Sequence, residues 1–225
     1  MPLSIEKISE NAVMYQNSGF HKLGTDSVLL SEFAPVKKNQ LVCDLGAGQG
    51  ALSLLLFLRE PSLKIHGIEL LPDAAELCFL NMMRNGFYDS FNIHVGDMRA
   101  LRFENQGRFD LAVSNPPYFK SGSGKKSPAE TRHISRCDDF CTVDDLCRTA
   151  ARTVKYGGLF SVVYVADRFC DMICSMRKHK LEPKIMRFVH KDFTSPPSLV
   201  LITARLGGAP DVKILPPLFT RNTLP

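Results

Sequence analysis

The sequence lacks the features that mark membrane-spanning and secreted proteins. No stretch approaches the roughly 20 uninterrupted apolar residues that a membrane span needs, and there is no internal repeat or low-complexity tract. The opening MPLSIEKISEN has no basic head followed by an apolar core, so it does not predict a secretory signal. These absences argue against a membrane partner and predict an ordinary globular fold.

The cysteines fit neither a disulfide framework nor a zinc site. There are seven of them, an odd number, scattered through predicted helices and strands, which is typical of buried thiols in a reducing compartment. Cys137, Cys141 and Cys147 match no CxxC pair, and His133 precedes them at an unsuitable separation. We therefore expect a cytoplasmic protein that holds no metal ion.

What the sequence does contain is enough for one mildly basic domain. At 225 residues the chain is long enough for one full α/β domain, with little left for a second. Hydrophobic residues make up 44% and charged residues 23%, which is ordinary for a globular protein. The net charge of +5 permits a nucleic-acid partner by attracting phosphates, although many small-molecule enzymes share such a charge.

Strand and helix patterns alternate along the chain. Strands are expected at residues 40–45, 63–70, 91–95, 109–114, 159–165, 184–189 and 198–205, and helices at 28–33, 51–59, 73–85, 142–154 and 167–179. This alternation predicts an α/β, Rossmann-like fold whose seven-stranded sheet is mostly parallel, with helices on both faces. The last two strands have no helix between them and should form an antiparallel edge hairpin. We expect a single domain, in which a lead-in of residues 1–40 covers the ligand site of residues 41–225.

A glycine-rich loop, Asp44 to Gly50 (DLGAGQG), leaves the first of these strands and enters a helix. Gly46, Gly48 and Gly50 let the backbone turn tightly and approach a ligand that a Cβ would obstruct. The segment also satisfies the dinucleotide fingerprint, with Glu69 as the ribose-binding acid, so the loop alone permits a nicotinamide cofactor. A glycine turn without a ligand is the simpler alternative.

Asp44 favours S-adenosylmethionine over a dinucleotide. A carboxylate at the mouth of the loop would repel a pyrophosphate, but it can pair with the ammonium group of a methionine moiety. Glu69 would then bind the two ribose hydroxyls, and Asp97, at the end of the third strand, would accept a hydrogen bond from the adenine amino group. Acids that merely cap helices at the ends of strands are the alternative.

The tetrapeptide Asn115-Pro116-Pro117-Tyr118 closes the fourth strand, at the edge of the sheet where ligands bind in this fold. The Asn115 side-chain oxygen and the Pro116 carbonyl can each accept one N–H of a conjugated amine, so that its lone pair points at the sulfonium methyl group. The two prolines have a fixed φ and stiffen this arrangement, and Tyr118 would stack on the extruded base or amide. The motif predicts an N-methyltransferase that works mainly by proximity and orientation; a turn with a buried tyrosine is the alternative.

The segment that follows, residues 119–136, is polar, Gly/Ser-rich and basic. Loops beside an active site commonly hold substrate, and cations there could contact the phosphates of an RNA substrate. A merely solvated loop is the alternative. The candidate cations are Lys120, Lys125, Lys126, Arg132 and Arg136.

With these residues placed, the chain resembles the bacterial valine-tRNA (adenine-N6)-methyltransferase family within the small-domain methyltransferases. The resemblance covers nearly the whole chain. Its motifs are HKLGTDS at 21–27, the loop at 44–50, NPPYFK at 115–120, the glycine pair at 207–208 and ILPP at 214–217.

The resemblance implies methylation of an adenine N6 in the anticodon loop of one tRNA. Asp44, Glu69 and Asp97 would then bind the cofactor, residues 115–118 would hold the adenine, and Thr25 would line the methionine end. The chain departs from the family pattern after Arg136, where it has Cys-Asp and the family often has His-Glu.

Several other functions remain open at this point. The NPPY motif also serves enzymes that methylate a glutamine amide in release factors, but these carry an N-terminal helical domain for which residues 1–40 are too few. Methylation of rRNA or DNA amino groups is a further option, although DNA enzymes commonly add a target-recognition domain. A non-catalytic Rossmann-like binding module is disfavoured by the intact motif residues, and an NAD-linked oxidoreductase lacks a placed Tyr-Lys pair.

Overall fold

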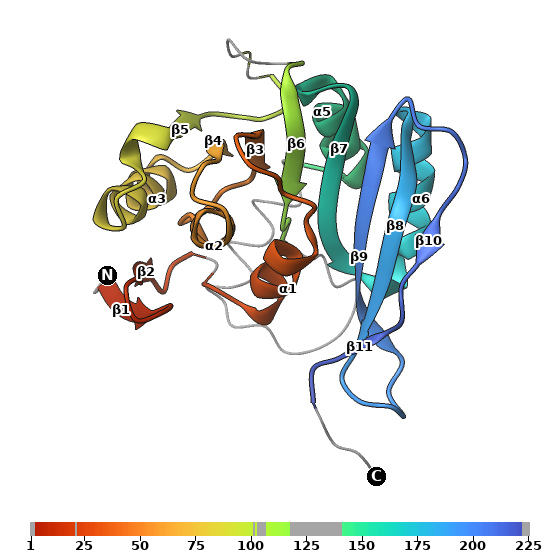
Figure 1. The fold of residues 1–225 in the computed structure, drawn as a ribbon, viewed down its shortest axis with the longest axis horizontal. Helices are drawn as coiled ribbons and strands as arrows, with labels where there is room; N and C mark the ends of the chain where they lie inside the picture. The colour runs from red at the N-terminus through yellow and green to blue at the C-terminus, as the bar shows by residue number, and fades with distance from the viewer. Residues whose placement is uncertain (1–2, 21, 101, 103–106, 118–140, 222–225) are drawn as a thin grey trace.

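The computed structural model describes residues 3–20, 22–100, 102, 107–117 and 141–221. Among these residues the largest unit is a nine-stranded sheet in the order β10-β8-β9-β7-β6-β3-β4-β5, with β11 also paired to β8 (Figure 1). Its strands are β3 (Leu41–Leu45), β4 (Lys64–Glu69), β5 (Phe91–Val95), β6 (Phe109–Ser114), β7 (Val154–Val165), β8 (Leu181–His190), β9 (Pro197–Leu206), β10 (Lys213–Ile214) and β11 (Leu218–Phe219).

The sheet is mostly parallel. Strand β9 runs antiparallel to both of its neighbours, β7 and β8, whereas the other paired strands described run parallel. The predicted α/β fold is therefore confirmed, including the antiparallel pairing of the last two long strands. The sequence did not predict β10 and β11, because two residues are too few to show the alternation of a strand.

Helices cover both faces of this sheet. On one face α1 (Thr25–Phe33), α2 (Ala51–Arg59) and α3 (Pro72–Arg84) bury residues such as Leu30, Phe57 and Met82. On the other face α5 (Val143–Thr153) and α6 (Phe169–Lys178) bury Leu146 and Met172. In Figure 1, α1 and α2 lie in front of the strands, and α5 and α6 lie behind them. Apolar side chains on both faces explain why the central strands read as continuous hydrophobic runs.

The residues before α1 contain a small hairpin that the sequence did not predict. Strands β1 (Leu3–Lys7) and β2 (Val13–Asn17) pair antiparallel and form a separate two-stranded sheet. Side-chain amides of α3 hold β2: Asn81 Oδ1 accepts from Tyr15 N at 2.8 Å, and its Nδ2 donates to Tyr15 O at 3.0 Å. Asn85, one turn later, makes the same pair of bonds to Val13. The two amides thus replace a neighbouring strand.

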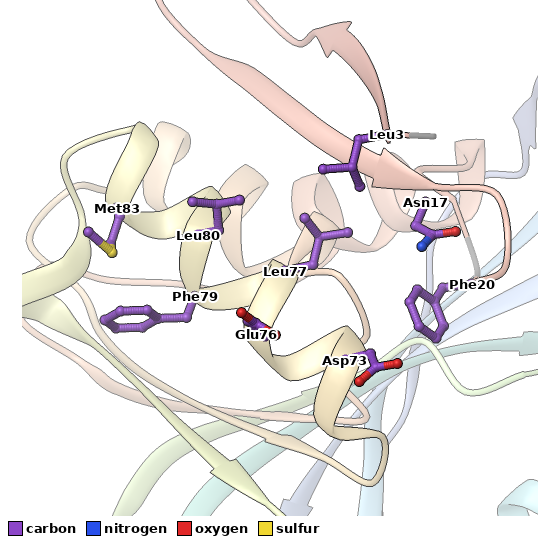
Figure 2. A pocket seen from close by; sticks show the side chains of 9 residues that line it. All are labelled: Leu3, Asn17, Phe20, Asp73, Glu76, Leu77, Phe79, Leu80 and Met83. Carbon is purple, nitrogen blue, oxygen red and sulfur yellow. The ribbon is translucent and has the colours of Figure 1, made fainter. Parts of the chain in front are cut away.

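A shallow hollow of about 390 Å³ lies between this hairpin and α3 (Figure 2). Leu3 of β1 and Leu80 and Met83 of α3 line it, and each of these side chains is 41% to 50% exposed. Phe20, which follows the hairpin, lines both this hollow and the larger cavity described below. The position of the hairpin is therefore linked to the wall of that cavity.

The glycine pair before the fifth predicted strand has a different role from the one expected. The expected strand of residues 159–165 begins directly after Gly157 and Gly158, a pair that is typical of a turn. In the structure both glycines lie inside β7, which begins at Val154. The pairing with β6 shifts register here, and Gly157 has a φ of 77°. A bulge needs the same backbone freedom as a turn, so the glycines alone could not distinguish the two.

Candidate active site

A cavity of about 670 Å³ opens at the carboxyl ends of β3, β4 and β6. Parallel strands of such a sheet expose these ends at one edge, where ligands bind in the fold. A volume of this size suits a nucleoside-sized ligand. The predicted residues among its lining are Asp44, Gly46, Gly48, Glu69, Asp97, Asn115, Pro116 and Pro117.

The three glycines of the loop all have positive φ, but they serve two purposes. Gly46 and Gly48 line the cavity with φ of 80° and 55°, and a Cβ on Gly48 would meet no described atom within 4 Å. Such a Cβ would occupy the open space beside the loop. A Cβ on Gly50 would instead come within 2.8 Å of Cys78 Sγ in α3. Gly50 is not among the residues that line the cavity, and the close packing of α2 on α3 already requires a glycine here. Its place beside the cofactor stays a prediction.

Asp44, at the end of β3, is 1% exposed. Its Oδ2 accepts a hydrogen bond from Ser53 Oγ at 2.7 Å, while its Oδ1 is buried and has no hydrogen-bond partner in the described part of the chain. Burial raises the pKa of this carboxyl to about 7; the Ser53 hydroxyl lowers it and the nearby Glu69 charge raises it. A buried oxygen without a donor fits an ammonium group, which supplies both N–H donors and a positive charge.

Glu69, at the end of β4, is held by backbone N–H groups. Its Oε2 accepts from Gly48 N at 2.8 Å and its Oε1 from Leu71 N at 2.9 Å. The carboxylate therefore braces the glycine loop against the next strand. Each carboxylate oxygen can accept a second hydrogen bond, so this position leaves room for two hydroxyl donors from a ribose.

Asp97 lines the cavity but has a partner that the sequence did not predict. The Arg99 guanidinium donates to both carboxylate oxygens, with Nε–Oδ1 at 3.0 Å and Nη2–Oδ2 at 2.6 Å. This hydrogen bonding holds the pKa of Asp97 below its usual value. The carboxylate thus stays ionised, and an adenine amino group would share it with Arg99.

Asn115 follows β6, and its amide is oriented by a residue from another element. Its Nδ2 donates to Ser27 Oγ in α1 at 2.9 Å. The two heteroatoms of an amide point in different directions, so this bond sets the direction of Oδ1. Pro116 and Pro117 line the cavity beside it. Tyr118 and the five predicted cations of residues 119–136 lie outside the described residues.

The lead-in reaches the cavity through other residues than Thr25. Thr25 is exposed and begins α1, whose N-cap is Gly24 without a side-chain cap, and Thr25 does not line the cavity. Lys22 and Ser27 line it instead. On α1 the hydroxyl that faces the cavity comes two residues later, because successive residues of a helix point in different directions. The contact of Thr25 with the methionine end stays a prediction.

Among the described residues no three His, Cys, Asp or Glu side chains come together in a way that could hold a metal ion. Burial raises the pKa of both Cys141 and Cys147 to about 11. Metals bind the thiolate form of cysteine, so these two thiols are poor ligands at neutral pH. No helix in the same part of the chain is long and apolar enough to cross a membrane.

The sheet order, the acidic glycine loop and the Asn-Pro-Pro turn at the end of β6 together define a class I methyltransferase that uses S-adenosylmethionine. Residues 18–179 match the methyltransferase small domain, and the chain belongs to this family.

Curated relatives include three that share one name, tRNA1(Val) (adenine(37)-N6)-methyltransferase. The protein from Phocaeicola vulgatus is 31% identical over 86% of this chain and 81% of its own length. Those from Yersinia enterocolitica and Escherichia coli O157:H7 are 33% and 32% identical over 65% and 70% of this chain. The match spans less than two thirds of these last two proteins, 58% and 65% of their lengths.

Solved structures share the fold at low sequence identity. A predicted O-methyltransferase of Agrobacterium tumefaciens has a TM-score of 0.70 and 18% identity, and the match covers 87% of each chain. Geranyl diphosphate C-methyltransferase of Streptomyces coelicolor has a TM-score of 0.60 and 14% identity over 80% of this chain and 79% of its own. Their acceptors differ, so these two similarities concern the fold alone.

Proposed function

We propose that this enzyme transfers a methyl group from S-adenosylmethionine to the exocyclic N6 of the adenine at position 37 of tRNA1(Val). Asn115 carries this proposal, because its amide follows β6 at the cavity and is fixed by Ser27. The names of the curated relatives, at 31% to 33% identity, support the choice of acceptor. An enzyme with this substrate would work in the cytoplasm.

We further propose a role for each side chain of the cavity. The Asp44 carboxylate pairs with the cofactor's ammonium group, Glu69 accepts hydrogen bonds from the ribose hydroxyls, and Asp97 accepts one from the cofactor's adenine amino group. Asn115 Oδ1 and the Pro116 carbonyl accept the two N–H groups of the target amine. The cofactor supplies an electrophilic methyl group on a sulfonium, and no residue has to act as a strong base, since the methylated amine can release its proton to water.

The two hydrogen bonds from the target amine to Asn115 Oδ1 and the Pro116 carbonyl suit an acceptor nitrogen that is planar. A lone pair conjugated to a ring is available only above and below the plane of the amine. Two acceptors that hold both N–H groups therefore also hold the lone pair, in a direction that the protein fixes. The rigid φ of Pro116 and the Ser27 hydrogen bond keep these acceptors in place before the substrate binds.

The main alternative keeps the chemistry and changes the acceptor to a glutamine amide of a release factor. A carboxamide is also planar and conjugated, so the Asn-Pro-Pro turn alone would accept it. Amino groups of rRNA or DNA are further acceptors of the same kind, and a non-catalytic binding module is the alternative without chemistry.

The test is to incubate the protein with cofactor labelled in its methyl group and, separately, total tRNA, rRNA, DNA and a release factor. Label in tRNA that is recovered as N6-methyladenosine after nucleoside digestion is the expected result. Label in the release factor alone would overturn the proposal and support the glutamine alternative.

The matched control is the Asn115→Ala variant, assayed with the same four acceptors. It should still bind the cofactor, because Asp44 and Glu69 are unchanged, and should transfer no measurable label. Equal loss of cofactor binding and transfer would show that Asn115 acts on the cofactor rather than on the acceptor.

A further inference from the structure

A group of aromatic and basic residues, of which Phe219 is half-buried and the others are exposed, lies at the carboxyl end of β8. We call it the β8–β9 tip and define it as Lys191, Phe193, Phe219 and Arg221. Phe193 is 58% exposed, although it is large and apolar. Its ring packs on Phe219 of β11, with centroids 4.1 Å apart and planes inclined by 35°. Lys191 and Arg221 are exposed as well.

The tip is held in one conformation by hydrogen bonds. Arg221 N donates to Lys191 O at 2.9 Å, and Thr220 N donates to His190 O at 2.9 Å, so the segment after β11 continues alongside the turn. Within the turn, Asp192 Oδ1 accepts from the backbone N–H and the hydroxyl of both Thr194 and Ser195. The acid of this turn is therefore engaged internally, and a fixed platform costs little conformational entropy when it binds a partner.

The tip lies at the same edge of the sheet as the active site. Strand β6 is parallel to β7, and both β7 and β8 are antiparallel to β9, so the carboxyl ends of β6 and β8 point the same way. Figure 1 shows the β8–β9 turn and β11 at this edge, below the end of β6. Helix α1, which carries Ser27, packs against β7 and β9 between them. A substrate that enters the cavity could therefore extend onto the tip.

The tip itself carries a small excess of positive charge. It contains two cations, Lys191 and Arg221, and the turn between β8 and β9 contains one acid, Asp192, whose Oδ1 is engaged by Thr194 and Ser195. Among the described residues, Lys191 and Arg221 take part in no ion pair. Unpaired cations beside an exposed aromatic ring suit a single-stranded nucleic acid, which offers phosphates and stackable bases together.

We propose that the β8–β9 tip binds unpaired nucleotides of the RNA substrate outside the methylated base, with a base stacked on Phe193 and phosphates contacted by Lys191 and Arg221. This inference rests on the proposed function, since it assigns a second contact surface to the same substrate. The stacking needs an exposed face of the Phe193 ring. The contact with Phe219 holds the ring at the surface, where it is 58% exposed. The site is distinct from Asn115, which holds only the target amine.

A fluorescence experiment tests the contact without any methyl transfer. The chain contains no tryptophan, so the Phe193→Trp variant carries a single indole at the tip. Titration with the unmodified anticodon stem-loop RNA of tRNA1(Val) should quench this fluorescence, because a stacked base quenches an indole. The Tyr156→Trp variant is the control: Tyr156 is 82% exposed, but it lies near the start of β7, at the opposite edge of the sheet. Equal quenching of both variants, or of neither, would overturn the proposal.

Steady-state kinetics test whether the contact serves the reaction. The Phe193→Ala variant should raise the KM for the tRNA transcript about tenfold, as expected for one lost stacking contact, with the KM for the cofactor unchanged. Lys191→Glu should have a similar effect. The control is Lys180→Glu, which changes the net charge equally just before the start of β8, at the opposite edge. Equal loss in the two charge variants would indicate net charge alone and overturn a local contact.

Failure of this inference is distinguishable from failure of the proposed function. If the wild-type protein methylates tRNA but Phe193→Ala leaves the KM for tRNA unchanged, the tip does not bind the substrate and the proposed function stands. If the wild-type protein methylates only a release factor, and the Phe193→Trp indole is not quenched by RNA, both are overturned.

Discussion

At the scale of single residues, the ionisation of Asp44 should make cofactor binding depend on pH. Its carboxyl is buried, and burial raises its pKa to about 7, above the ordinary value of 3.8. Below pH 7 the group therefore carries a proton in the cofactor-free protein and cannot pair with a cation. The pKa of this carboxyl is higher in the folded state than in the unfolded state. Its contribution to the free energy of unfolding is therefore fully present below about pH 3.8 and is lost as the pH rises to about 7.

Cofactor affinity should show the opposite trend. Between pH 6 and pH 8 the ionised fraction of a group with a pKa of about 7 rises about tenfold, so we expect the Kd of the cofactor to fall by about that factor. Calorimetric titration of the protein with the cofactor at several pH values measures this change in Kd. In the Asp44→Asn variant the affinity should be weaker and nearly independent of pH. An unchanged pH dependence in that variant would assign the titration to another group.

We expect Ser27 to act on the acceptor through Asn115, as a positioning residue. Ser27→Ala removes the hydroxyl that accepts from Asn115 Nδ2 at 2.9 Å. Loss of one hydrogen bond that orients the half-buried Asn115 amide is expected to change a rate by about tenfold, so kcat should fall by about that factor while the KM for the cofactor changes little. Ser27→Thr keeps a hydroxyl and should restore much of the rate.

Ser31 offers the matched control for this prediction. It lies one turn later on the same helix, is buried to a similar extent, and donates its hydroxyl to Val28 O at 2.7 Å, away from the cavity. Ser31→Ala should leave kcat within about twofold of wild type, as a change outside the site. If both alanine variants lose rate equally, the effect of Ser27 is on α1 as a whole.

The sequence could predict those cavity residues that stand in a recognisable local pattern. Asp44, Glu69 and Asn115 each end a hydrophobic strand, and in a parallel sheet such ends meet at one edge. Ser27 and Asn115 are 88 positions apart, and their contact depends on how α1 packs. The Arg99–Asp97 ion pair was missed for a different reason, since a spacing of two residues is common in any polar turn.

At the scale of elements, the hairpin depends on two side chains rather than on its own pattern. All five residues of β1 are exposed, so no buried face predicts a strand there. Strand β1 pairs with β2, and β2 is in turn bonded at Tyr15 by the amide of Asn81, which is fully buried in α3 and also donates to Gln49 O at 2.9 Å. Asparagines on a predicted helix do not indicate that their side chains will bind the backbone of a strand. By contrast β5 and β6 were predicted to the residue, because their apolar runs are bounded by turn signals.

Removal of one amide should therefore loosen the hairpin as a unit. Asn81→Ala leaves Tyr15 N and O without their partners, and the free energy of unfolding should fall by about 1–3 kcal/mol. Amide hydrogen exchange of residues 3–17 should accelerate more than that of the central sheet. Cofactor binding should weaken too, since Ser18, Gly19 and Phe20 line the cavity. Asn92→Ala, exposed on β5, is the control; uniform acceleration over the whole sheet in Asn81→Ala would contradict a local role.

At the scale of the whole molecule, one edge of one sheet carries both proposed functions. The carboxyl ends of β3, β4 and β6 form the cavity, and that of β8 carries the tip. Tyr156 and Lys180 lie at the opposite edge of the sheet. They serve as controls because they are an exposed aromatic and an exposed cation, as in the tip, but lie far from the cavity. The polarity of the strands, which the sequence predicted, decides which residues can act on one substrate.

The cofactor should stabilise the whole fold, because its site joins elements from both halves of the chain. Glu69 braces the glycine loop, and α1 of the lead-in is bonded to the end of β6 through Ser27 and Asn115. A ligand at 100 times its Kd adds about 2.7 kcal/mol to the free energy of unfolding, which for a domain of this size raises Tm by about 5–10 °C. Thermal unfolding followed by circular dichroism measures this shift. Glu69→Ala should lose most of it at the same cofactor concentration, whereas Phe193→Ala, at the tip, should keep it in full. An equal loss in both variants would mean that the shift reports general destabilisation rather than occupation of the cavity.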